Sequence, residues 1–155
     1  MTRILAANCV AVALLGLAAT AGATIVVGRS IGGVKLAMTQ AEVRAVLGRP
    51  ARVVRAKNEF GSYTEFRYAG YIVDFQGGAR VTGIVTTLPR ERTRKGAGVG
   101  STWAGIKAKV RGVRCQGAPA YGDCHVGAFV PGKVVTDFVF RRGAVSKVAV
   151  GIVID

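Results

Sequence analysis

The sequence has few acidic residues, few prolines and a single histidine. Its 155 residues include 8 Asp and Glu, 1 His and 4 Pro, against 22 Lys and Arg. Acid–base catalysis and metal binding both need several acidic or histidine side chains close together, so the chain offers few candidate residues for either. Hydrophobic residues make up 50% of the chain and charged residues only 19%, which excludes a fully disordered or collagen-like chain. One compact unit, or two very small ones, is expected.

The N-terminal segment 1–23 has the composition of a secretory signal peptide. Arg3 precedes a long apolar run, and the small residues 21–23 follow it. We expect cleavage after Ala23, which would leave the protein secreted, periplasmic or in the cell envelope. The alternative is an N-terminal membrane anchor, because the uncharged stretch continues through Val27 and exceeds the roughly 20 residues that cross a bilayer.

Removal of the leader would also remove Cys9 and leave Cys115 and Cys124 as a pair. An even number of cysteines in an exported chain predicts a disulfide bond. The intervening segment 116–123 contains two glycines and a proline, which allow the chain to turn back. A metal site would need two more ligands, and His125 is the one candidate nearby, so we expect no metal and no cofactor.

Two segments of the mature chain share a pattern. Thr39 and Glu42 form a capping box, which predicts a short helix, and a similar sequence begins at Thr102. Alternating apolar residues after each helix predict strands. We therefore expect an α+β fold, a tandem repeat of a short helix followed by a three- to four-stranded antiparallel sheet.

The expected organisation has three parts after the leader. These are a first repeat over 24–88, a basic Gly-rich linker over 89–100 and a second repeat over 101–155. Apolar residues at helical spacing should pack each helix on its sheet: Val43, Leu47, Ile106 and Val110.

The segment Gly33 to Pro50 reads Gly-Val-x-Leu-x-Met-Thr-x-x-Glu-Val-x-x-x-Leu-Gly-x-Pro, and a Phe-x-x-Gly-x-Val turn occurs at 140–145. This pattern resembles a group of small exported α+β modules, the SmpA/OmlA-type outer-membrane assembly domains and the tandem-repeat β-lactamase inhibitory proteins. The likeness to the inhibitory proteins implies a secreted, non-catalytic protein that binds a partner through the concave face of its sheets. It assigns no partner-contacting residue.

The net charge of +14 is the other functional clue. A basic surface attracts anionic polymers such as cell-wall polyanions or phospholipid headgroups. Basic residues concentrate after each predicted helix, and the candidate anion-binding residues are Arg52, Arg55, Lys107 and Lys109. A compositional bias toward Ala, Gly, Val and Arg explains the charge equally well. A basic surface also keeps a domain soluble. Nucleic acid is disfavoured as a partner, because the chain is predicted to be exported and lacks an aromatic-rich binding motif.

The titratable residues favour binding over catalysis. His125, Ser101 and an Asp could be combined into a triad, but His125 lies in or beside the predicted cystine loop, where a partly exposed strand histidine is expected. Asp74 and Asp137 are expected to be solvated strand positions on the face opposite the aromatics. We therefore predict a secreted non-catalytic binding or inhibitory module, not an enzyme, whose partner is an unidentified protein. The alternative is a structural cell-envelope protein that associates with anionic wall or membrane polymers through its basic surface. In the first case, aromatics such as Tyr63 or Tyr121 would carry the interface.

Overall fold

The computed structural model describes residues 24–154, so the predicted signal peptide, 1–23, lies outside the described residues. Strands account for 46% of the described residues and helices for 11%, so this part of the protein is mostly β. The large sheet contains β4 (Arg52–Asn58), β5 (Gly61–Tyr68), β6 (Tyr71–Gln76), β7 (Gly83–Thr86), β8 (Arg114–Gln116), β9 (Asp123–Val126), β10 (Val134–Arg141) and β11 (Ala144–Ile152). The remaining elements are β1 (Ile25–Val26), β2 (Ser30–Ile31), β3 (Val34–Lys35), α1 (Gln40–Leu47) and α2 (Trp103–Lys109).

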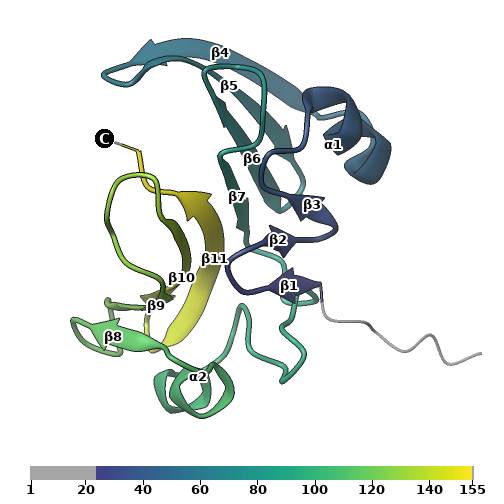
Figure 1. The fold of residues 1–155 in the computed structure, drawn as a ribbon. Helices are drawn as coiled ribbons and strands as arrows, with labels where there is room; N and C mark the ends of the chain where they lie inside the picture. Colours follow the sequence, from purple (N-terminus) through teal and green to yellow (C-terminus); the bar gives the residue numbers. More distant parts are fainter. Residues whose placement is uncertain (1–23, 155) are drawn as a thin grey trace, which may run out of the picture.

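The large sheet is continuous. Its eight antiparallel strands run in the order β4-β5-β6-β7-β11-β10-β9-β8 (Figure 1). The ladder between β7 and β11, in which Ile84 lies opposite Val150, joins strands from the two parts of the chain. A second sheet, of three strands, has the order β1-β2-β3.

The predicted α+β tandem repeat of a helix followed by its own sheet is therefore wrong. Residues 24–154 fold as a mostly β protein with an eight-stranded and a three-stranded sheet, and the helices in this range span only 8 and 7 residues. Alternation along a strand shows which residues share a face, but it does not show which strands pair. The three short strands of the N-terminal sheet have two residues each, too few to show a period.

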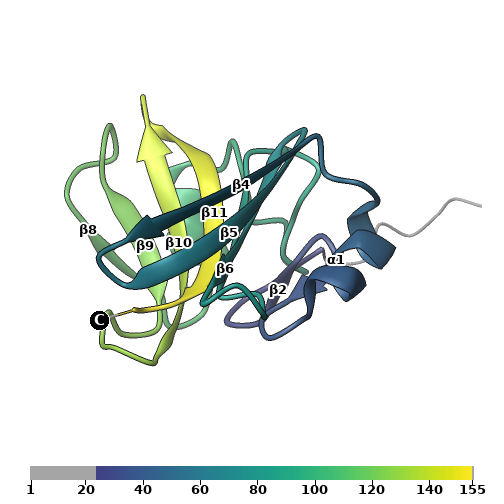
Figure 2. The ribbon, with the colours of Figure 1, turned by 90° about the horizontal axis from the view of Figure 1, so that it is seen from above.

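The core lies on one face of the large sheet, which we call the core face. It is formed by Phe66 and Phe75, whose ring centroids are 4.8 Å apart, and by the buried Phe138. The helices and the three-stranded sheet supply the other buried residues of the same cluster, among them Val43, Ile106 and Val34. The sheet is strongly twisted, so that β4 and β5 cross β9 to β11 at a steep angle when the molecule is viewed from above (Figure 2).

The predicted helix start at Thr39 is confirmed. The Thr39 hydroxyl accepts a hydrogen bond from the Glu42 backbone N–H at 3.3 Å, and the Glu42 carboxylate accepts one from the Thr39 backbone N–H at 2.7 Å. These hydrogen bonds lower the pKa of the Glu42 carboxyl. The predicted core residues Val43, Ile106 and Val110 are buried, and Leu47 is half-buried against the same core.

The predicted disulfide joins Cys115 and Cys124. The two cysteines lie directly opposite each other on β8 and β9, and their Cα atoms are 4.0 Å apart. Gly122 allows this turn, because a Cβ at that position would lie 2.3 Å from the Gln116 carbonyl oxygen.

Replacing both cysteines by alanine should lower the free energy of unfolding by about 2–3 kcal/mol, because the closed loop is short. Chemical denaturation of the oxidised proteins measures this difference. A reductant should then destabilise the wild type by a similar amount and leave the alanine variant unchanged. An equal response of both proteins to the reductant would contradict the assignment.

The segment 89–100, which we expected to be a linker, runs between β7 and α2 and contains buried side chains. Glu91 is 3% exposed and Ala97 is fully buried. Arg92 exchanges backbone and side-chain hydrogen bonds with Thr24, so this segment contacts the start of the described chain.

Candidate functional site

The face of the large sheet opposite the core carries the candidate site, and we call it the outer face. Alternate residues of each strand project there, while their neighbours form the core. From β5 to β9 these outer-face residues include Tyr63, Glu65, Arg67, Ile72, Asp74, Gln76, Val85, Ala149, Asp137, Val139, Asp123 and His125. The centre of the face has little side-chain volume, because Gly83 pairs with Gly151 and Val85 with Ala149.

Three hollows lie along the outer face. The first, of about 450 Å³, lies between the β4–β5 turn and the C-terminal end of β11, and Tyr63, Asp74 and Ile154 line it. The second, of about 480 Å³, is bordered by Tyr121 and Lys147. The third, of about 230 Å³, lies beside Ile72 and Val85. Hollows on a sheet face can receive side chains of another molecule, so this face is a candidate binding surface.

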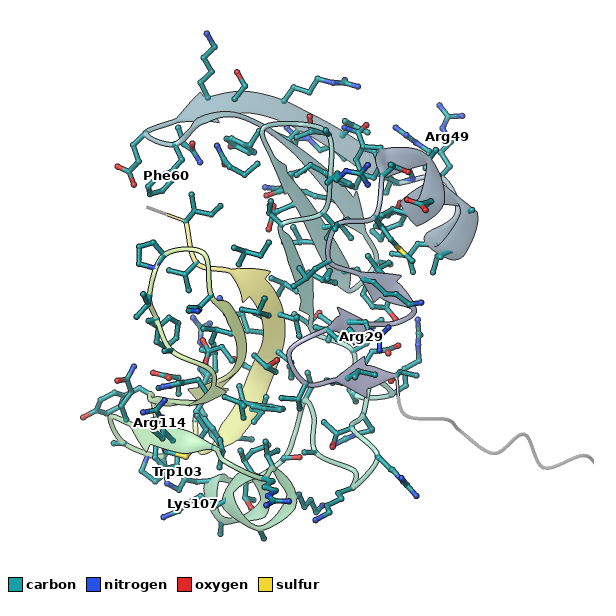
Figure 3. The ribbon with its side chains drawn as sticks, viewed as in Figure 1. Arg29, Arg49, Phe60, Trp103, Lys107 and Arg114 are labelled. Carbon is teal, nitrogen blue, oxygen red and sulfur yellow. A yellow bond between two sulfur atoms is a disulfide. The ribbon has the colours of Figure 1, made fainter. Side chains whose placement is uncertain are left out.

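Exposed aromatic side chains border the first and second of these hollows. Phe60 is 42% exposed at the β4–β5 turn (Figure 3), and Tyr121 is 77% exposed. Phe129 and Val130 are also exposed, and the Phe129 ring contacts His125 with ring centroids 4.7 Å apart. Solvent-exposed aromatic side chains grouped on one face are typical of a protein-binding surface.

Hydrogen bonds hold the β4–β5 turn in place beside the first hollow. The side-chain amides of Asn58 and Gln76 bond to each other reciprocally at 3.2 Å. The Gln76 amide also donates to the Phe60 carbonyl at 2.8 Å. The Phe60 side chain therefore stands on a fixed backbone, which reduces the conformational entropy lost on binding.

Asp74 lies half-buried in the floor of the first hollow. Burial, and then the charge of Glu65 on the neighbouring strand, raise the pKa of Asp74 to about 6. Gly83 lies directly beside this carboxylate, since a Cβ there would be in van der Waals contact with Asp74 Oδ2, at 3.4 Å. Arg67 pairs with Glu65 and leaves Asp74 without a direct cationic partner among residues 24–154.

Asp137 is a second half-buried carboxylate on this face. Burial, and then the charge of Asp123, raise the pKa of Asp137 to about 6. Its Oδ1 atom is buried and has no hydrogen-bond partner within the described residues. His125 lies opposite Asp137 in the ladder but contacts Asp123, with Nδ1 3.1 Å from Oδ2. Because Oδ1 is already covered, a bound molecule would reach this half-buried carboxylate through its other oxygen.

Three inter-strand spacings separate Asp74 on β6 from Asp137 on β10, roughly 14 Å along the sheet. The two carboxylates therefore do not form a catalytic pair, which requires separations of about 5–9.5 Å. Both side chains point away from the aromatics, as predicted, but they are half-buried and not solvated.

Replacing Asp137 by asparagine should raise the thermal midpoint at pH 7.5 by a few degrees, corresponding to about 1 kcal/mol for a partly screened group. Because the folded-state pKa is raised to about 6 from 3.8, the folded protein binds more protons than the unfolded chain between these values. Stability therefore falls as the pH rises through this window, and the asparagine variant avoids that loss.

Calorimetry at pH 7.5 and at pH 3.5 checks this pH dependence. At pH 3.5 Asp137 and its replacement should give nearly the same midpoint. Glu59→Gln, which alters an exposed acid, should change neither value. An equal shift for Asp137→Asn at both pH values would show that its effect does not come from the buried charge.

The four candidate anion-binding residues do not form one patch. Arg52 and Arg55 are exposed on β4, and they project to opposite faces of this edge strand. Lys107 and Lys109 are exposed on α2, at the other end of the molecule (Figure 1). Charges on an edge strand also prevent strand pairing between molecules, so Arg52 and Arg55 have a structural explanation.

Ser101 and His125 have different partners. The Ser101 hydroxyl accepts hydrogen bonds from the Gly98 backbone N–H at 3.1 Å and from Arg92 at 3.4 Å, whereas His125 contacts Asp123. Within residues 24–154, no group of three or more His, Cys, Asp or Glu is placed to hold a metal ion. No helix in that range is long and apolar enough to cross a membrane.

Most of the exposed apolar residues around the outer face, which we call its apolar rim, were not predicted from the sequence. Phe60, Phe129 and Ile154 lie in turns or at the C-terminal end, where no periodicity distinguishes exposed from buried residues. An aromatic residue in a polar turn, such as Phe60 after Asn58 and Glu59, was the available signal.

No protein-family model matches this chain, and no curated protein matches it. Among solved structures, the crystal structure of YjgB, a DUF4309 family protein from Bacillus subtilis subsp. subtilis str. 168, has a similar fold. The TM-score is 0.51 with 17% sequence identity, over 81% of this chain and 88% of that chain. At this identity the likeness concerns the fold alone.

Proposed function

We propose that this protein is a secreted, non-catalytic binding or inhibitory module that holds a protein partner on its outer face. The observation that carries the proposal is the grouping, on one sheet face, of three hollows with exposed Phe60 and Tyr121. Interface hot spots are rich in aromatic residues beside well-packed pockets, which is the arrangement on this face.

The outer face also indicates the chemistry of the partner. Four of the chain's 8 acidic residues lie on it: Glu65, Asp74, Asp123 and Asp137. Covering the rest of the half-buried Asp137 carboxylate would be costly unless the partner supplied a donor. The proposed partner therefore presents apolar side chains together with a lysine or arginine, and it is not an acidic polymer.

The resemblance of the segment 33–50 to exported binding domains agrees with this proposal. An inhibitory module needs no catalytic group of its own, because covering a partner's functional surface is enough. The fixed turn at Phe60 favours such a role, since a preorganised surface loses little entropy on binding.

Affinity capture from envelope and culture fractions, with the exported protein as bait, tests the proposal. The double variant Phe60→Ala/Tyr121→Ala should weaken binding of the captured protein at least 30-fold, as expected for two interface aromatics. Val46→Ala is the matched control, because Val46 is 44% exposed on α1, outside the outer face. It should leave binding unchanged.

Equal capture by the wild type and the Phe60/Tyr121 variant would overturn the outer-face assignment. Asp137→Ala provides a second readout. It should weaken binding and reduce its dependence on pH around 6, where Asp137 titrates in the free protein.

A second candidate function is association with anionic wall or membrane polymers. The observation that favours it is the scarcity of ion pairs: within residues 24–154, Arg67 and Arg90 are the two basic residues other than histidine that contact an acid. Charge reversal at Lys107 and Lys109 should then release the protein from isolated envelopes at lower salt. Salt-insensitive retention would exclude this function.

A further inference from the structure

An apolar hollow with a basic rim lies beside β1, and none of its lining residues borders the three hollows of the outer face. Its volume is about 420 Å³. β1, the segment 93–95 and the end of α2 form its walls. The apolar lining consists of Ile25, Val26, Val27 and Val110. Val26 is 42% exposed, so apolar surface in the hollow is open to solvent.

Four cationic side chains border the same hollow: Arg94, Lys95, Lys109 and Arg111. All four are exposed, and within residues 24–154 none of them pairs with an acid. The Lys109 ammonium reaches from α2 toward the 93–96 turn, since it lies 3.9 Å from the position of a Cβ on Gly96. The acid nearest in sequence, Glu91, is buried and accepts a hydrogen bond from Tyr71.

The combination of an apolar floor and a cationic rim selects an amphiphilic anion. A hydrated polyanion would gain nothing from Val26 and Val27, whereas an acyl chain would remove their exposed surface from water. Lysine and arginine can extend aliphatic stems along such a chain and keep their charges at the rim. The volume falls within the range of small-molecule sites, about 300–1,000 Å³.

We propose that this hollow binds a long-chain carboxylate, with the acyl chain on Val26 and Val27 and the carboxylate between Lys95, Lys109 and Arg111. The site is separate from the outer face and does not depend on the proposed protein-binding function.

Displacement of a dansyl-labelled undecanoate from the exported protein measures this binding. Dodecanoate should compete with one site per molecule and bind at least 10-fold more tightly than hexanoate, because each buried methylene adds to affinity. Dodecanoate should also bind at least 10-fold more tightly than dodecanol, which lacks the charge.

Val26→Asp and the double variant Lys95→Glu/Lys109→Glu should each weaken dodecanoate binding at least 10-fold. Lys107→Glu is the control, because Lys107 is exposed on α2 but does not line the hollow. Its affinity for dodecanoate should equal that of the wild type. Unchanged thermal midpoints in all variants would show that the fold is intact.

Several results would overturn the proposal. Equal affinity for hexanoate and dodecanoate would indicate simple ion pairing. Binding to phosphatidylglycerol vesicles without binding to dodecanoate would indicate a membrane surface as the ligand. Failure of dodecanoate to bind, together with a dimer that Val26→Asp dissociates, would identify a second copy of the chain as the occupant.

Discussion

Replacing Phe66 by alanine should lower the free energy of unfolding by about 3–5 kcal/mol, a large part of the stability of a domain of this size. Phe66 is fully buried on β5 and packs against Phe75, and the Arg44 guanidinium lies 4.3 Å from its ring centroid. Alanine would leave a cavity between α1 and the sheet and would remove both aromatic contacts.

Trp103 reports whether the loss is shared by the whole molecule. It lies on α2 and packs on Phe140, with ring centroids 4.9 Å apart. Because β7 pairs with β11, Phe66 and Trp103 belong to one continuous core cluster. The fluorescence transition of Trp103 should therefore shift together with the far-UV circular dichroism transition.

Val46→Ala provides the comparison, because it truncates an exposed side chain on α1 and should change stability by less than about 0.5 kcal/mol. If the Phe66 variant lost ellipticity at low temperature while the Trp103 transition kept its wild-type midpoint, the two parts of the sheet would be independent units. That outcome would contradict the continuous sheet.

The features that could be predicted from the sequence are those fixed by nearby residues. The Thr39 and Glu42 capping box needs only two side chains one helical turn apart, and the hydrogen bonds that it predicts are present. The disulfide depends on a short turn between Cys115 and Cys124. Both follow from local geometry, so neither required knowledge of the fold.

Strand pairing could not be predicted in the same way. The contacts that make one sheet, such as Ile84 opposite Val150, join residues far apart in the chain. The strands β5, β6, β7, β10 and β11 share an alternating pattern, so many pairings among them satisfy it equally well. The prediction of separate sheets therefore failed, although Val73 and Phe75 were correctly placed on one face.

The outer-face carboxylates show a similar limit. Alternation placed Asp74 and Asp137 opposite the aromatics, but a solvated environment was expected. Their burial comes from neighbouring strands and from the twist of the sheet, which the pattern of a single strand does not contain. The sequence therefore predicted which face of the sheet carries these carboxylates. It did not predict how deeply they are buried or which exposed apolar residues surround them.

Tyr71 and Glu91 form a buried polar pair between β6 and the segment 89–100. The Tyr71 hydroxyl donates to Glu91 Oε1, and the two residues are 7% and 3% exposed. Burial and this hydrogen bond raise the pKa of Tyr71 to about 12, so its hydroxyl stays a donor. Gly32 lies directly against the ring, because a Cβ there would be 2.8 Å from the Tyr71 hydroxyl oxygen.

Tyr71→Phe should lower the free energy of unfolding by about 3 kcal/mol, although it removes a single oxygen atom. The Glu91 carboxylate would then be buried without its hydroxyl donor, and the other contact, Arg90 Nε, lies 3.4 Å away. Urea denaturation measures the change. Tyr68→Phe is the matched control, because the partly exposed Tyr68 hydroxyl bonds to a carbonyl oxygen, and its loss should cost less than about 1 kcal/mol.

The double variant Tyr71→Phe/Glu91→Leu separates two contributions to the loss of stability, that of the missing hydrogen bond and that of the buried Glu91 carboxylate left without its hydroxyl donor. Removing the carboxylate together with its donor should restore part of the stability lost in Tyr71→Phe, because replacing both members of a buried polar pair is far less costly than removing one. A double-mutant cycle gives the coupling energy. If Tyr71→Phe cost no more than Tyr68→Phe, or if Glu91→Leu added to the loss, the buried carboxylate would not depend on Tyr71.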